Sequence, residues 1–155
     1  MKICIFGNSH IAALHLGWKL VSQAYPDLHF AFFGAPDGDM SSVEFKDSML
    51  VATSERVAEN MRHSGGADRI VLGDYDAIVI VGGRIGVARC MRDLRPYRLY
   101  EGPSGVEAPA QAPLMSRGLL RSAIADLVRT SRLNYFIDKI NSELALPVLF
   151  VSTPH

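Results

Sequence analysis

A change of hydrophobic period near the start of the chain constrains the fold more than any other feature. Residues 2–6 form a short apolar run that stops at Gly7, which is typical of a buried strand in a parallel sheet. After the glycine, large apolar residues recur at helical spacing: Ile11, Leu14, Trp18 and Val21. The sequence therefore predicts a strand over 2–6, a tight turn, and a helix over 9–24.

Ser9 lies in this turn, and two roles are open to it. Its side chain could cap the helix by accepting a hydrogen bond from a backbone N–H. It could also present its hydroxyl at the carboxyl end of the sheet, where open α/β sheets bind ligands. The turn contains Gly7 alone, so it is neither a dinucleotide fingerprint nor a P-loop, and it lacks the second glycine of a G-x-S-x-G elbow.

The remaining patterns alternate between strands and helices. We expect strands over 28–33, 49–53, 69–72, 76–81 and 146–152. We expect helices over 54–63 and 85–95, a loop over 96–113, and either two helices or one helix bent at 130–131 after the cap Ser116. With right-handed crossovers this order predicts a three-layer α/β domain of flavodoxin-like type, a mainly parallel sheet with helices on both faces.

Charge and composition exclude several classes of protein. The formal net charge is +0, which gives no electrostatic support for nucleic-acid binding. No apolar run reaches the length of about 20 residues that a membrane-spanning helix needs. Lys2 leads directly into a short strand rather than a signal peptide, so we expect a cytoplasmic protein. Cys4 and Cys90 do not suggest a disulfide framework, and no metal-ligand spacing is present.

Arginines cluster after the strand over 76–81. One interpretation is a solvated helix face, and the other is an anion site, because guanidinium groups pair bidentately with carboxylate, sulfate or phosphate. The clustered residues are Arg84, Arg89, Arg92, Arg95 and Arg98.

Three short blocks resemble the SGNH (GDSL-type) hydrolase superfamily, and together they span most of the chain. Phe6-Gly7-Asn8-Ser9-His10 is similar to the block in which strand one runs into Gly-Asp-Ser or Gly-Asn-Ser, whose serine is the nucleophile. Gly34 stands where the family has an oxyanion-hole glycine, although it could equally be a turn glycine. Gly82-Gly83-Arg84 stands in the family's Gly-x-Asn block.

Arg84 replaces the asparagine that donates to the oxyanion in the family. An arginine could still stabilise an oxyanion, or it could bind the acid group of a ligand in a site without hydrolysis. Four other residues within these blocks are expected to contact substrate: Asn8, His10, Gly82 and Gly83.

The general base is missing from its usual place, because the chain has no Asp-x-x-His block. His10 directly follows the nucleophile, so its side chain should point away from the serine hydroxyl. His15 is expected on the exposed side of its helix and His29 at the far end of its strand. His155 follows the last strand at the correct edge of the sheet, so we expect it to serve as the base.

The resemblance implies a single SGNH-hydrolase-like domain over 1–155 that lacks the C-terminal Asp-x-x-His segment. It implies a serine esterase that needs no cofactor or metal and acts on a small-molecule or carbohydrate ester, as in SGNH-like proteins encoded near bacterial polysaccharide genes.

The alternative is a non-catalytic module that binds a carbohydrate or an anion through Arg84. A third hypothesis is a nucleotide-binding Rossmann-like or flavodoxin-like domain. We expect neither a nucleic acid nor a membrane as partner, and a homodimer could cover an exposed apolar strand or face.

Overall fold

A computed structural model of the chain describes residues 1–35, 40–82, 92, 94, 96–99 and 113–151. They fall into two compact units, Met1–Arg84 with Arg132–His155, and Ile85–Ser131. The prediction of a single domain over 1–155 stays a prediction.

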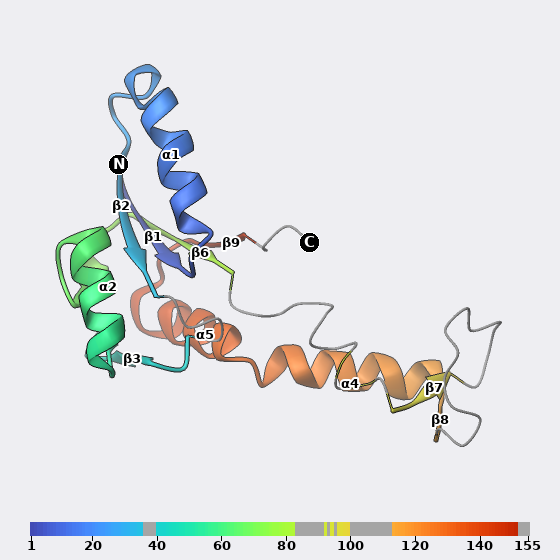
Figure 1. The fold of residues 1–155 in the computed structure, drawn as a ribbon. Helices are drawn as coiled ribbons and strands as arrows, with labels where there is room; N and C mark the ends of the chain where they lie inside the picture. Colours follow the sequence, from blue (N-terminus) through green and yellow to red (C-terminus); the bar gives the residue numbers. More distant parts are fainter. Residues whose placement is uncertain (36–39, 83–91, 93, 95, 100–112, 152–155) are drawn as a thin grey trace. The chain divides into compact units, whose positions relative to one another are not determined.

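A four-stranded parallel sheet forms the centre of the first unit (Figure 1). Its strands are β1 (Lys2–Gly7), β2 (His29–Gly34), β6 (Ala77–Val81) and β9 (Val148–Val151). They lie in the order β2-β1-β6-β9, and every neighbouring pair is parallel. The structure therefore confirms an α/β fold built on a parallel sheet, with strands where the apolar runs predict them.

The register of this sheet places side chains on two faces. Ile5 of β1 lies beside Phe32 of β2 and Val79 of β6, and all three point to one face. Phe6 lies beside Phe33 and Ile80 and points to the other face. Cys4, Phe6, Ile78 and Ile80 have no exposed surface, so the core is centred on this second face.

Helices contact the side chains on both faces of the parallel sheet. Helix α1 (Ile11–Val21) starts near the arrowhead of β1 and runs back along the sheet (Figure 1), and its Ile11 and Trp18 pack with Ile5 and Phe32. A short 3-10 helix, η1 (Ser22–Ala24), continues it. Helix α5 (Arg132–Leu144) places the Phe136 ring edge-on to Phe6, with 6.3 Å between ring centroids.

Along the chain, a small antiparallel sheet is formed by residues between β2 and β6. It contains β3 (Val43–Lys46), β4 (Met49–Ala52) and β5 (Arg69–Val71), with α2 (Glu55–Gly65) after β4 and η2 (Leu72–Asp74) after β5. The predicted elements over 49–53, 54–63 and 69–72 correspond to β4, α2 and β5, whereas β3 was not predicted. Ser54 caps α2 by accepting a hydrogen bond from the N–H of Val57.

In the second unit, α4 (Arg117–Arg129) follows the paired short strands β7 (Arg98–Leu99) and β8 (Leu114–Met115). Ser116 caps α4, as predicted, by accepting a hydrogen bond from the N–H of Leu119. Helices α4 and α5 are separate, so of the two alternatives at 130–131 the two-helix one is correct. Most of the predicted helix over 85–95 and most of the predicted loop over 96–113 lie outside the described residues, and the two described residues of the former, Arg92 and Leu94, are helical.

The apolar stripes of the last two helices differ in burial. Helix α5 buries Leu133, Phe136 and Ile140. Helix α4 buries none of its residues, so its stripe is not core, and Leu119 keeps 55% of its surface exposed. No helix in the part of the chain that the structure describes is long and apolar enough to cross a membrane.

Candidate functional site

The candidate site lies where the order of strands in the parallel sheet reverses. From β1 the chain first adds β2 on one side and later adds β6 on the other. Open α/β sheets bind ligands outside the carboxyl ends of their strands at such a switch point. Gly7, Gly34 and Gly82 lie at or just after the carboxyl ends of β1, β2 and β6, so the structure brings one glycine of each predicted block to the same edge.

Gly7 allows the carboxyl ends of β1 and β6 to approach closely. A Cβ atom at Gly7 would lie only 2.2 Å from the carbonyl oxygen of Val81. The N–H of Asn8 donates to the same oxygen over 3.3 Å. The turn that carries Ser9 is therefore held directly against the end of β6.

Asn8 fixes this turn through its side chain. Its Oδ1 accepts a hydrogen bond from the N–H of His10 over 3.1 Å, a local bond that asparagine commonly makes in turns. Its amide also lies over Gly82, where a Cβ atom would be 2.4 Å from Nδ2. Gly82 has a φ of +90°, which disfavours any residue with a side chain. The Asn8 side chain and Gly82 are thus packed directly against each other.

Ser9 is exposed and its side chain does not cap the helix. His10 is the residue at the N-cap of α1, and no side chain accepts a hydrogen bond there. Of the two roles open to Ser9, the structure therefore does not show helix capping, and it is Asn8 whose side chain accepts the N–H of His10. Within the described residues, neither the hydroxyl nor the backbone N–H of Ser9 has a hydrogen-bond partner. As far as the described residues go, both groups are open to a ligand.

The N–H of Gly34 points away from β1. The next residue, Ala35, donates its N–H to the carbonyl oxygen of Gly7 over 2.7 Å. Successive N–H groups of a strand point to opposite sides, so the N–H of Gly34 faces α2, where it donates to the hydroxyl of Ser64 over 2.8 Å. Gly34 could serve in an oxyanion hole only after this bond breaks.

Ser64 is a residue that the sequence interpretation missed. Its hydroxyl accepts from Gly34 and donates to the carbonyl oxygen of Asn60 over 2.7 Å, so it joins the end of β2 to the last turn of α2. No local pattern could have indicated this contact, because the two partners are separated by 30 positions in sequence.

The histidines are placed differently from some expectations. His10 is exposed beside Ser9. His15 was expected on the exposed side of its helix, and this is wrong: its ring stacks on Phe32 with 4.6 Å between centroids. His29 begins β2 opposite Lys2, at the amino end of the sheet and far from Ser9, as expected.

Several predicted site residues lie outside the described residues. They are Gly83, Arg84 and His155. Of the arginine cluster, Arg89 and Arg95 are also outside, and Arg92 is exposed. Within the described ranges, no three His, Cys, Asp or Glu side chains form a group that could hold a metal ion.

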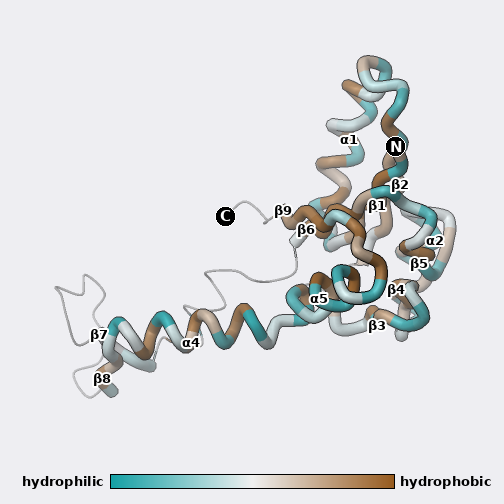
Figure 2. The backbone as a smooth tube through the Cα atoms, turned by 180° about the vertical axis from the view of Figure 1, so that it is seen from behind, coloured by the Kyte–Doolittle hydropathy of each residue, from teal (hydrophilic) through white to brown (hydrophobic). Residues whose placement is uncertain are grey.

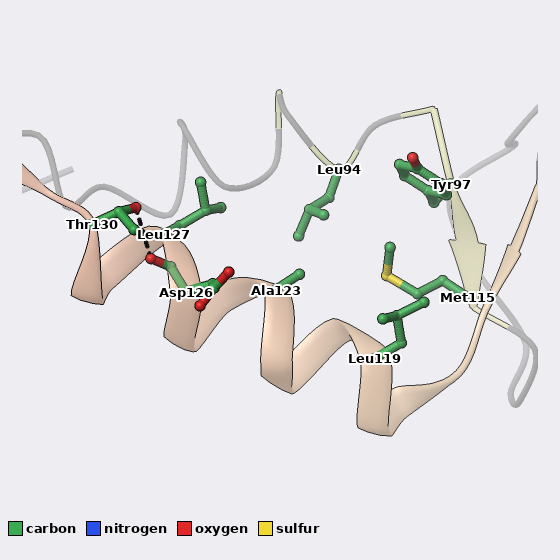
Figure 3. Close-up of a pocket in the computed structure, with 8 residues that line it drawn as sticks. All are labelled: Leu94, Tyr97, Met115, Leu119, Ala123, Asp126, Leu127 and Thr130. Atoms are coloured by element: carbon green, nitrogen blue, oxygen red, sulfur yellow. Dashed lines mark hydrogen bonds between the residues drawn. The ribbon is translucent and has the colours of Figure 1, made fainter.

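The second unit contains a separate open pocket of about 440 Å³ on one side of α4 (Figure 3). Most of its lining is apolar, and the polar side chains are at its ends. The lining residues are Leu94, Tyr97, Met115, Leu119, Ala123, Asp126, Leu127 and Thr130. The Asp126 carboxylate already accepts a hydrogen bond from Arg129 over 2.7 Å, and none of the predicted site residues lines this pocket.

No protein-family model matches the chain, and neither the curated proteins nor the solved structures include a significant match to it. The residues at the carboxyl edge of the sheet are therefore the basis on which we infer a function.

Proposed function

We propose that the chain is a serine ester hydrolase of the SGNH type, with Ser9 as nucleophile and an acylated small molecule or carbohydrate as substrate. One observation carries the proposal: the Ser9 hydroxyl is exposed and unbonded among the described residues, on a turn held at the switch point of a parallel sheet. The three-layer, flavodoxin-like arrangement and a cytoplasmic location belong to the same proposal.

In the proposed reaction, the Ser9 oxygen attacks the ester carbonyl carbon and its proton passes to a base. The resulting oxyanion accepts a hydrogen bond from the N–H of Ser9, which is free of partners among the described residues. Collapse of this intermediate breaks the bond to the leaving alcohol, which takes up the proton and departs. Water then attacks the acyl-serine, releases the carboxylic acid and restores Ser9. His155 is the proposed base, and Arg84 is a proposed second oxyanion donor.

The test is turnover of short acyl esters, such as p-nitrophenyl acetate and an O-acetylated sugar. We expect hydrolysis by the wild type and none above background by Ser9→Ala. Ser142→Ala is the matched control, because Ser142 is an exposed serine on α5 that bonds to the carbonyl of Lys139. Equal turnover by the wild type and Ser9→Ala would refute the proposal.

A second candidate is a non-catalytic module that binds a carbohydrate or an anion at the same edge. It is favoured by the absence, among the described residues, of a base bonded to Ser9, and by the engagement of the Gly34 N–H with Ser64. Here Arg84 is the proposed anchor, and the probe is a hexuronic acid, which combines a sugar ring with a carboxylate. We expect Arg84→Ala to abolish binding measured by calorimetry, and Arg69→Ala, an exposed control that pairs with Asp68, to preserve it.

A further inference from the structure

Helix α1 has the composition of a buried helix. Its sequence is Ile-Ala-Ala-Leu-His-Leu-Gly-Trp-Lys-Leu-Val, and Lys19 is its single Lys, Arg, Asp or Glu residue. Surface helices of globular proteins normally keep a polar face, and a helix that is apolar on all sides is normally covered on all sides.

The structure covers only one side of α1. Ile11 is buried, and His15 and Trp18 are half-buried against the sheet. On the outer side, Leu16 is 64% and Leu20 is 86% exposed. Figure 2 shows hydrophobic residues recurring along α1. The outer side is therefore an apolar surface that no other described element of the first unit covers.

This outer surface contains both a ridge and a groove. Leu16 and Leu20 are four positions apart, so they stand one above the other on the helix. Ala13 and Gly17 form an adjacent row of small residues, and a Cβ atom at Gly17 would meet nothing within 4 Å. Helices pack by setting the ridge of one into the groove of the other.

We propose that this chain forms a homodimer through α1, in which the Leu16–Leu20 ridge of each copy fills the Ala13–Gly17 groove of the other. A second copy fits this surface because the same face carries both the ridge and the groove. A two-fold axis places the ridge of each copy opposite the groove of the other. The charges agree, since the face contains no acidic residue that would indicate a basic partner, and the net charge of +0 does not repel a second copy. The proposal is independent of any activity of Ser9.

Analytical ultracentrifugation over a wide concentration range tests this dimer. We expect a reversible dimer for the wild type and a dissociation constant raised about tenfold or more for Leu20→Glu. Leu149→Glu is the matched control, because Leu149 is 61% exposed in the same unit on the edge strand β9, which β6 separates from β1. A monomeric wild type would overturn the proposal, as would a dimer that Leu149→Glu breaks and Leu20→Glu preserves.

Gly17→Leu separates the shape argument from general hydrophobicity and from misfolding. The change makes α1 more apolar and a better helix former, so folding is retained, which far-UV circular dichroism checks. It fills the groove, so we expect it to weaken the dimer to a similar extent as Leu20→Glu. A Gly17→Leu protein that dimerises as strongly as the wild type would contradict the ridge-in-groove arrangement.

Discussion

Gly82→Ala should damage the candidate site through two separable effects. The first is backbone strain, because alanine would have to adopt the φ of +90° found at Gly82. The second is a collision, because its Cβ would lie 2.4 Å from Nδ2 of Asn8. Gly66 is the matched control: its φ is +83°, and a Cβ atom there would meet nothing within 4 Å.

The two effects can be given magnitudes. A left-handed conformation costs a non-glycine residue about 1–2 kcal/mol, so we expect Gly66→Ala to lose this amount. Overpacking typically adds about 1–3 kcal/mol, so Gly82→Ala should lose about 2–5 kcal/mol in total. Asn8→Ala removes the atoms that collide. In that background, Gly82→Ala should cost only the strain, about 1–2 kcal/mol.

Urea unfolding followed by circular dichroism measures each free energy of unfolding. The wild type, Asn8→Ala, Gly82→Ala and the double variant form a double-mutant cycle. A coupling energy near zero would refute the inferred packing of Asn8 over Gly82. Equal losses for Gly82→Ala and Gly66→Ala would refute it independently.

Two further predictions concern a buried thiol and a partly buried hydrogen bond. Burial raises the pKa of the Cys4 thiol from 9.0 to about 12, so between these values the folded state keeps a proton that the unfolded state loses. The free energy of unfolding of the wild type should therefore fall between about pH 9 and pH 12. Cys4→Ala should lack this part of the fall when the wild type and the variant are unfolded in urea across that range. Loss of the Ser64 hydroxyl leaves the Gly34 N–H without its acceptor, so Ser64→Ala should destabilise the fold by about 1–3 kcal/mol and speed amide exchange at Gly34. An unchanged exchange rate at Gly34 would contradict the second, and identical pH profiles would contradict the first.

The parallel strands were predictable because their signal is local. The runs over 2–6 and 76–81 are apolar, partly β-branched and closed by glycine, which few other structures combine. The meeting of three glycine-ended blocks at one edge followed from parallel pairing alone. Strand β3 was missed because it is short and depends on its partner, β4. The turn between them, Asp47-Ser48, has positive φ at both residues without the glycine that usually marks such a turn.

Helix α1 shows where periodicity is insufficient. Leu14 and His15 lie on either side of the line through Ile11 and Trp18, so both fit helical spacing. Hydrophobicity favoured Leu14 as the residue that faces the sheet. In the structure His15 faces it instead, because its imidazole stacks on the ring of Phe32. The bond from Gly34 to Ser64 was unpredictable for a different reason, because it depends on how α2 approaches β2. Tertiary contacts of this kind leave no local pattern.

The central claim is that Ser9 is an activated nucleophile, and labelling with a fluorophosphonate tests it most directly. The intact mass of the wild type should increase by one phosphonyl group, peptide mapping should place that group on Ser9, and Ser9→Ala should remain unlabelled. An unlabelled wild type, or equal labelling of the wild type and Ser9→Ala, would contradict the claim.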